Sequence, residues 1–566
     1  MHDEAIDLPD ANDDPRRAAD GRAWIAAAFV VAAAFLVRLI GLDHTPHIDE
    51  LYHVLAGRSL LEDGSLRLSP DGMIYTRARP FTFLVAGSMA LFGDSLAAAR
   101  LPAAISGALL AGAVFLAVAR YGDPLAAWLA ALLVMLAPTD LYLSQLVRFY
   151  TLHALLVWVA AIAVYALAAR APRRDRATLA LAAGAAAALY LAFRLQPSTA
   201  LAVAAIAAAA VPVAAWTHRA RLRATPAWGW ALAAALLTLG GAWLAFGGFG
   251  AKLLGAFRAE GTIVLGRDAG PRFYFDYFAR LFGGLWTALP VLAAVALARR
   301  PRFTIYLCVL AAVAFVAVSL SSWRHERYVY FALPAVYVVA ALGVGTILRW
   351  IRAGWAARLL AAGAGPRARP WATALTAAVG LFAGGFAAHT VDAASYSYRM
   401  LTVDDSDWWL GGHFRGEADW GAVAAILEGR VAADAALVAT SPQKAAYYFG
   451  DLDFVLLGRA VSRRGGYDDE PGIDRQWNRQ EIASPAAVRA VMACNPRGVI
   501  VAEEREWRRP EGVPTLTADF IERSAHPLEV PTGTRIRVFV WGPADGPEAP
   551  PEGWSCESDG GVARGG

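Results

Sequence analysis

Long apolar blocks constrain this chain more than any other feature of its sequence. A membrane-crossing helix needs roughly 20 predominantly apolar residues, and blocks of about this length recur from residue 24 to residue 391. They raise the hydrophobic share of the 566 residues to 57%, above the roughly 45–50% of soluble domains. The predicted fold class is therefore a polytopic α-helical membrane protein, with eleven spans at 24–42, 97–119, 124–141, 149–169, 177–193, 198–216, 227–248, 273–298, 303–320, 328–348 and 371–391.

Arginines gather in alternate loops between these blocks. They lie in the tail 1–23 and in the loops around 170–176, 219–223, 299–302 and 349–369. The positive-inside rule places these segments in the cytoplasm. The first block has the length and flanking charges of a signal peptide. However, the cationic loops all fall on the cytoplasmic side only if this block remains as a span. We therefore expect an inner (plasma) membrane protein with a cytoplasmic N-terminus and a periplasmic or extracellular C-terminal domain.

Two regions outside the spans have enough sequence to fold. The loop 41–96, within a predicted transmembrane domain at 24–391, has apolar residues at one helical spacing from Leu51 to Leu61. This pattern predicts an amphipathic helix on the membrane surface, and residues 80–92 predict a second, interfacial helix. The polar region 392–545 predicts a small α/β domain, with strands near Ala436, Phe454, Gly498 and Arg535 and helices near Trp420 and Ala486.

The three cysteines fall in different environments. Cys308 lies inside an apolar block and is expected to be a small core residue. Cys494 and Cys556 belong to the polar C-terminal part, where they could pair in an oxidising compartment. The sequence leaves that pairing open, because the Gly- and Pro-rich tail 546–566 is predicted to be disordered. The net charge of +4 is small, and nothing predicts a nucleic-acid partner.

The adjacent carboxylates Asp49 and Glu50 lie just beyond the first span. One of them could act as a general base. Alternatively, both could be ordinary acidic residues of a first helical turn, favoured by the helix dipole. His47, Asp49 and His53 are a candidate divalent-metal set, although their spacing matches no specific zinc pattern. No other cofactor is predicted.

Cations recur at the outer ends of several spans. Taken singly, each is most simply a solvated loop charge or an anchor reaching towards lipid head groups, and Glu326 could neutralise Arg324 or Arg327. Taken together, cations at membrane depth usually mark a substrate path. The candidate phosphate ligands are Arg79, Arg148, Arg194 and Arg327. The neighbouring side chains that could contact substrate are His53, Tyr75, Tyr150, His325 and Tyr328.

Several of these segments resemble the GT-C superfamily of glycosyltransferases, in the branch of the protein O-mannosyltransferases and lipid A aminoarabinose transferases. The resemblance covers about residues 30–345 and is strongest at 36–106. It is carried by RLIGLDHTPHIDELYHVLAGRSLL with Asp49-Glu50, by YTRARPFTFLVAGSMALFGDSLAAARLPAAISG, by RFYTL and by ERYVYFALPAVYVVAALG. Two positions depart from the family pattern. Many relatives carry Lys where this chain has Arg79, and several carry an Asp near Arg148-Phe149-Tyr150, where none stands here.

The resemblance implies a glycosyltransferase with a polyprenyl-phosphate sugar donor and an extracytoplasmic acceptor, which could be a lipid, a protein or a surface glycan. Asp49 is the best-placed base, and a phosphate leaving group needs cations rather than an acid. One base and direct displacement predict inversion at the sugar. The rival interpretation is a transporter or lipid flippase, which often shows inverted repeats and polar groups near the midplane. The sequence shows no such repeat.

Overall fold

The computed structural model describes residues 21–170, 175–219, 272–320, 325–362, 368–390, 418–430, 432, 434–458, 472–542, 549–557 and 561–564. The chain divides into two compact units. The membrane unit comprises residues 1–42 and 100–403, and the mixed unit comprises residues 43–99 and 404–566.

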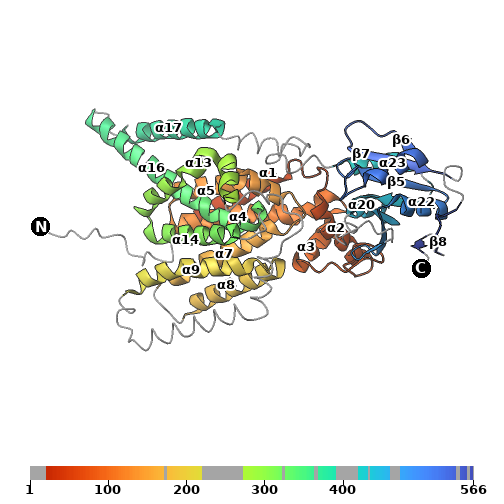
Figure 1. Cartoon of the computed structure of the whole chain (residues 1–566). Helices are drawn as coiled ribbons and strands as arrows, with labels where there is room; N and C mark the ends of the chain where they lie inside the picture. Colours follow the sequence, from red (N-terminus) through yellow and green to blue (C-terminus); the bar gives the residue numbers. More distant parts are fainter. Residues whose placement is uncertain are drawn as a thin grey trace. The chain divides into compact units, whose positions relative to one another are not determined.

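The membrane unit is a bundle of apolar helices (Figure 1). Within the described residues, eight helices are long and apolar enough to cross a membrane, or nine if one bent pair counts as a span. The helices are α1 (Gly21–Leu39), α4 (Leu96–Tyr121), α5 (Pro124–Leu136), α6 (Pro138–Ser144), α7 (Tyr150–Ala168), α8 (Arg176–Leu195), α9 (Thr199–Thr217), α13 (Phe273–Leu297), α14 (Pro301–Ser319), α15 (Glu326–Val329), the 3₁₀ turn η2 (Tyr330–Ala332), α16 (Leu333–Ala361) and α17 (Ala368–Thr390).

The structure confirms a polytopic helical membrane fold but not the count of eleven spans. The predicted span 227–248 lies outside the described residues. The predicted span 371–391 falls on α17, which is not among the eight. The predicted span 124–141 is instead a bent pair, α5 and α6, with an angle of 56° between them. The bend has a local cause, because Pro138 lacks the N–H that would continue α5.

The mixed unit contains a seven-stranded sheet of order β3-β4-β2-β1-β5-β7-β6. The central strands β4, β2, β1 and β5 run parallel, and β3, β7 and β6 are antiparallel to their neighbours. Strands and helices near all the predicted positions are present, which confirms the α/β domain. The elements are α19 (Trp420–Leu427), β1 (Ala436–Ala439), α20 (Pro442–Phe449), β2 (Phe454–Leu456), β3 (Gly472–Asp474), β4 (Arg479–Ile482), α22 (Pro485–Cys494), β5 (Gly498–Glu503), α23 (Thr515–Ser524), β6 (His526–Leu528) and β7 (Ile536–Trp541).

The first loop belongs to this same unit. It forms α2 (Ile48–Glu62) and α3 (Arg79–Phe92), and α2 lies beside α20 in Figure 1. Leu51, Leu55 and Tyr75 share one buried cluster with residues of the C-terminal domain, including Trp420 and Trp477. The apolar face of α2 is thus covered by protein, and the expectation that it lies on the membrane surface is wrong. The structure also groups the loop with the α/β domain and not with the spans.

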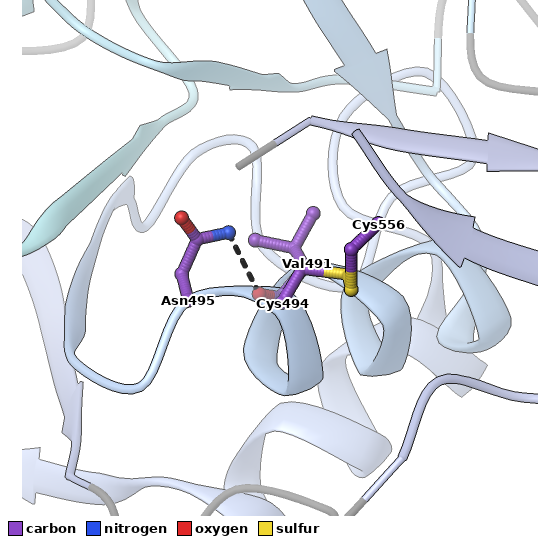
Figure 2. The surroundings of a disulfide bond; sticks show 4 residues. All are labelled: Val491, Cys494, Asn495 and Cys556. Atoms are coloured by element: carbon purple, nitrogen blue, oxygen red, sulfur yellow. Dashed lines mark hydrogen bonds between the residues drawn. A yellow bond between two sulfur atoms is a disulfide. The ribbon is translucent and has the colours of Figure 1, made fainter. Parts of the chain in front are cut away.

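The C-terminal tail is tied to the domain by a disulfide between Cys494 and Cys556. Figure 2 shows the bond at the end of α22, where the Asn495 amide also donates to the Val491 carbonyl oxygen at 2.9 Å. Two short strands, β8 (Trp554–Cys556) and β9 (Val562–Arg564), pair in the tail that was expected to be disordered. The disulfide offers a physical reason for this order, because it holds the segment against α22.

Candidate functional site

The N-terminus of α2 separates the roles of the two adjacent carboxylates. The Glu50 side chain accepts a hydrogen bond from the His47 backbone N–H at 2.9 Å. In return, His47 Nδ1 accepts from the Asp49 backbone N–H at 3.1 Å. This reciprocal pair is a capping box, and Glu50 is fully buried within it. Glu50 therefore fits the role of an acidic residue that stabilises the first helical turn. The half-buried Asp49 side chain remains the better candidate for a general base.

The proposed metal ligands do not form a cluster. His47 caps α2 through its Nδ1, and the buried His53 places its own Nδ1 2.9 Å from Thr82 Oγ1 on α3. Among the residues that the structure describes, no group of three or more His, Cys, Asp or Glu side chains could hold a metal ion.

The aromatic candidates of this unit pack inside it. Tyr75 stacks on Tyr52 with ring centroids 5.6 Å apart, and the His53 ring meets Tyr75 edge-on at 5.1 Å. Tyr52 also accepts a hydrogen bond from Gln443 Nε2 at 2.7 Å, which joins α2 to α20. Because Tyr75 and His53 are buried, this geometry favours support of α2 over direct contact with a substrate.

Arg79 begins α3 and is exposed. The residue before it, Ala78, has a φ of 49°, in the left-handed region. This conformation costs a residue other than glycine about 1–2 kcal/mol, and such strain tends to cluster at functional sites. Arg77 and Arg79 are therefore presented from a constrained turn.

In the membrane unit, two of the predicted cations meet at one aromatic ring. The guanidinium carbon of Arg148 lies 5.5 Å from the centre of the Tyr150 ring, and that of Arg327 lies 5.9 Å from the same centre. Arg148 Nη2 also donates to the Tyr150 hydroxyl at 3.3 Å. Arg148 is buried, whereas Arg327 is half-buried. Residues separated by nearly 180 positions are thus brought to one place in the bundle.

The segment carrying Arg327 is held at its start. The Tyr274 hydroxyl of α13 donates a hydrogen bond to the His325 carbonyl oxygen at 3.0 Å. The same hydroxyl accepts a hydrogen bond from the His325 backbone N–H at 3.2 Å. Glu326 pairs with His325 Nδ1 at 2.6 Å. Arg327 also lies over the Tyr328 ring, at 5.6 Å. The structure thus gives Glu326 a partner in His325, while Arg324 lies outside the described residues.

Arg194 is placed differently. It lies in the last turn of α8, is exposed, and donates to the Tyr190 hydroxyl of its own helix at 3.0 Å. Within the described part of the chain, its hydrogen bond and its ring contact are both with Tyr190 and not with Arg148 or Arg327.

Sequence reasoning missed a buried polar cluster in the same unit. Asp140, on α6, accepts hydrogen bonds from Tyr330 at 2.9 Å and from Tyr337 at 2.8 Å. All three side chains are buried. The available signal was an acidic residue inside a predicted span, which usually has a specific partner.

No protein-family model and no curated protein sequence matches this chain. Solved structures do match. ArnT from Cupriavidus metallidurans in the apo state superposes with a TM-score of 0.58 and 17% identity, over 93% of this chain and 99% of that one. ArnT bound to undecaprenyl phosphate gives a TM-score of 0.56 and 16% identity, over 91% and 98% of the two chains.

A third structure is the archaeal oligosaccharyltransferase AglB from Archaeoglobus fulgidus, in complex with an inhibitory peptide and a dolichol-phosphate. It gives a TM-score of 0.52 and 13% identity, over 85% of this chain and 69% of that one. Likeness at such identities is a likeness of fold. The chain therefore has the fold of ArnT and AglB, which is the fold expected from the sequence resemblance.

Proposed function

We propose that this protein transfers a sugar from a polyprenyl-phosphate donor to an extracytoplasmic acceptor. The observation that carries the proposal is the convergence of Arg148 and Arg327 on the Tyr150 ring. Two guanidinium groups beside a phenol form a donor-rich site suited to a phosphate. Two of the structures that share the fold contain undecaprenyl phosphate and dolichol-phosphate, respectively, and both ligands are polyprenyl phosphates.

In the proposed reaction, the acceptor hydroxyl oxygen attacks the anomeric carbon of the donor sugar. The bond between that carbon and the phosphate oxygen breaks, and the electron pair leaves with the polyprenyl phosphate. The hydroxyl proton passes to the Asp49 carboxylate, so that the sugar is transferred with inversion. Arg148 and Arg327 stabilise the charge that develops on the phosphate, and Arg79 is a further candidate for this role.

The disulfide supports an extracytoplasmic location for the mixed unit. Cys494 and Cys556 are paired, and structural disulfides persist mainly in oxidising compartments. A periplasmic or extracellular face would bring the proposed base, Asp49, to the side of the membrane where envelope acceptors lie.

The test uses the full chain, purified and reconstituted in lipid nanodiscs. Binding of undecaprenyl phosphate is measured by native mass spectrometry, and its release from undecaprenyl-phosphate sugars is measured in the presence of an envelope extract. A charge-assisted hydrogen bond contributes about 1.5–3 kcal/mol, so Arg148→Ala and Arg327→Ala should each weaken binding roughly 10–100-fold.

Arg120→Ala is the matched control, since Arg120 lies over the Tyr121 ring at 5.5 Å and has no proposed part in the site. It should bind within about twofold of the unaltered protein. Movement of lipid-linked sugars across vesicle membranes, without any release of undecaprenyl phosphate, would instead indicate a flippase.

A further inference from the structure

Both oxygens of the Asp140 carboxylate are engaged by the segment that follows Arg327. Tyr330 donates to Oδ1 at 2.9 Å, and Tyr337 donates to Oδ2 at 2.8 Å. Asp140 is completely buried, and each tyrosine is 1% exposed. A carboxylate at membrane depth is costly unless it is matched to partners. Two donated hydrogen bonds supply that match.

Tyr330 lies three residues after Arg327, in the 3₁₀ turn η2 that connects α15 to α16. On the other side of Arg327, Tyr274 fixes the backbone of His325 through two hydrogen bonds. Arg327 therefore lies on a short segment held at both ends by tyrosine hydroxyls. One of these anchors depends on Asp140.

A buried arginine lies at the bend that precedes Asp140. Arg38 of α1 donates to the Val134 carbonyl oxygen, at 3.0 Å, near the end of α5. This carbonyl lacks its usual helical donor because the residue four positions on is Pro138. A Cβ atom on Gly107 would lie 2.7 Å from Arg38 Nε, so a glycine at that position leaves room for the guanidinium. The cation therefore satisfies a backbone carbonyl at the bend between α5 and α6, the helix that carries Asp140.

We propose that Asp140 is a positioning residue for the donor phosphate. By holding Tyr330, it fixes the turn from which Arg327 reaches Tyr150 and the neighbouring Arg148. Asp140 does not itself contact the donor in this proposal. The inference rests on the phosphate site proposed above.

A purely structural role would predict a loss of thermal stability and nothing else. Tyr306→Phe provides the matched control, because the buried Tyr306 hydroxyl on α14 donates to the Ala161 carbonyl oxygen of α7 at 2.7 Å. Tyr330→Phe and Tyr306→Phe each remove one buried tyrosine hydrogen bond between helices, but only the former removes a bond next to Arg327.

The experiment measures undecaprenyl phosphate binding and melting temperature for the full chain in nanodiscs. Tyr330→Phe and Asp140→Asn should weaken binding about tenfold, while Tyr306→Phe lowers the melting temperature comparably to Tyr330→Phe and binds within about twofold of the unaltered protein. If Arg327→Ala weakens binding but Tyr330→Phe and Asp140→Asn do not, Asp140 is only structural and this inference is overturned. If Arg327→Ala also binds normally, the proposed phosphate site itself fails.

Discussion

Asp49 and Glu50 show how far a pair of residues can be interpreted from sequence. The motif located both at the start of a helix, and it left a catalytic and a structural role open for each. The structure separates them, because Glu50 is buried and completes the capping box with His47. The sequence did not separate the two carboxylates, because the N-cap residue of this capping box is a histidine, which is not among the residues usually found there.

This separation predicts opposite effects of two conservative substitutions. Asp49→Asn should reduce release of undecaprenyl phosphate from a sugar donor by about 10²–10⁴-fold, with little change in melting temperature. Glu50→Gln keeps an acceptor oxygen for the His47 N–H but loses the charge near the helix N-terminus. It should lower stability by about 0.3–1 kcal/mol and retain most turnover. A fully active Asp49→Asn protein would exclude Asp49 as the base.

At the scale of elements, the local sequence pattern predicted most of the helices and strands. The lengths of the apolar blocks predicted the spans that the structure describes. Short apolar runs predicted the strands near Ala436, Phe454, Gly498 and Arg535. The partners of these elements could not be predicted. The apolar face of α2 indicated a surface to be covered, but its cover includes Trp420 and Trp477, more than 350 residues away. The hydrogen bonds of Asp140 are non-local in the same way.

The contact between α2 and α20 makes a prediction about pH. Burial raises the pKa of Tyr52 above its ordinary value, although a hydrogen bond from Gln443 acts in the opposite direction. A tyrosine whose pKa is raised on folding contributes stability below its unfolded pKa of about 10, and that stability is lost as pH rises further. The melting temperature of the unaltered protein should therefore fall more steeply between pH 9 and 11 than that of Tyr52→Phe.

At neutral pH, Tyr52→Phe should itself be less stable by about 0.5–1.5 kcal/mol, because the bond to Gln443 is lost. The two melting curves should thus approach each other as pH increases. Parallel curves over this range would show that the Tyr52 hydroxyl does not titrate differently in the folded state.

For the whole molecule, the path of the chain through the membrane is constrained by the fact that the mixed unit is built from two distant segments. Residues 43–99 and 404–566 form one compact unit, and α2 shares its core with the C-terminal domain. Both segments must therefore lie on the same side of the membrane. An even number of crossings must separate them, and the ten spans predicted between residues 97 and 391 satisfy this condition.

The same constraint gives a test of sidedness that does not depend on counting helices. Alkaline phosphatase is active only outside the cytoplasm, and green fluorescent protein folds to fluoresce efficiently only inside it. Reporters inserted near Gly64, in the exposed turn after α2, and fused after Gly566 should both give the outside signal. Insertions near Arg174 and Arg221 should give the inside signal, because cationic loops stay in the cytoplasm.

Opposite signals from Gly64 and Gly566 would require an odd number of crossings, which the shared core of α2 and the sheet does not allow. Matching inside signals would keep that core but place the proposed base, Asp49, on the wrong side for an envelope acceptor.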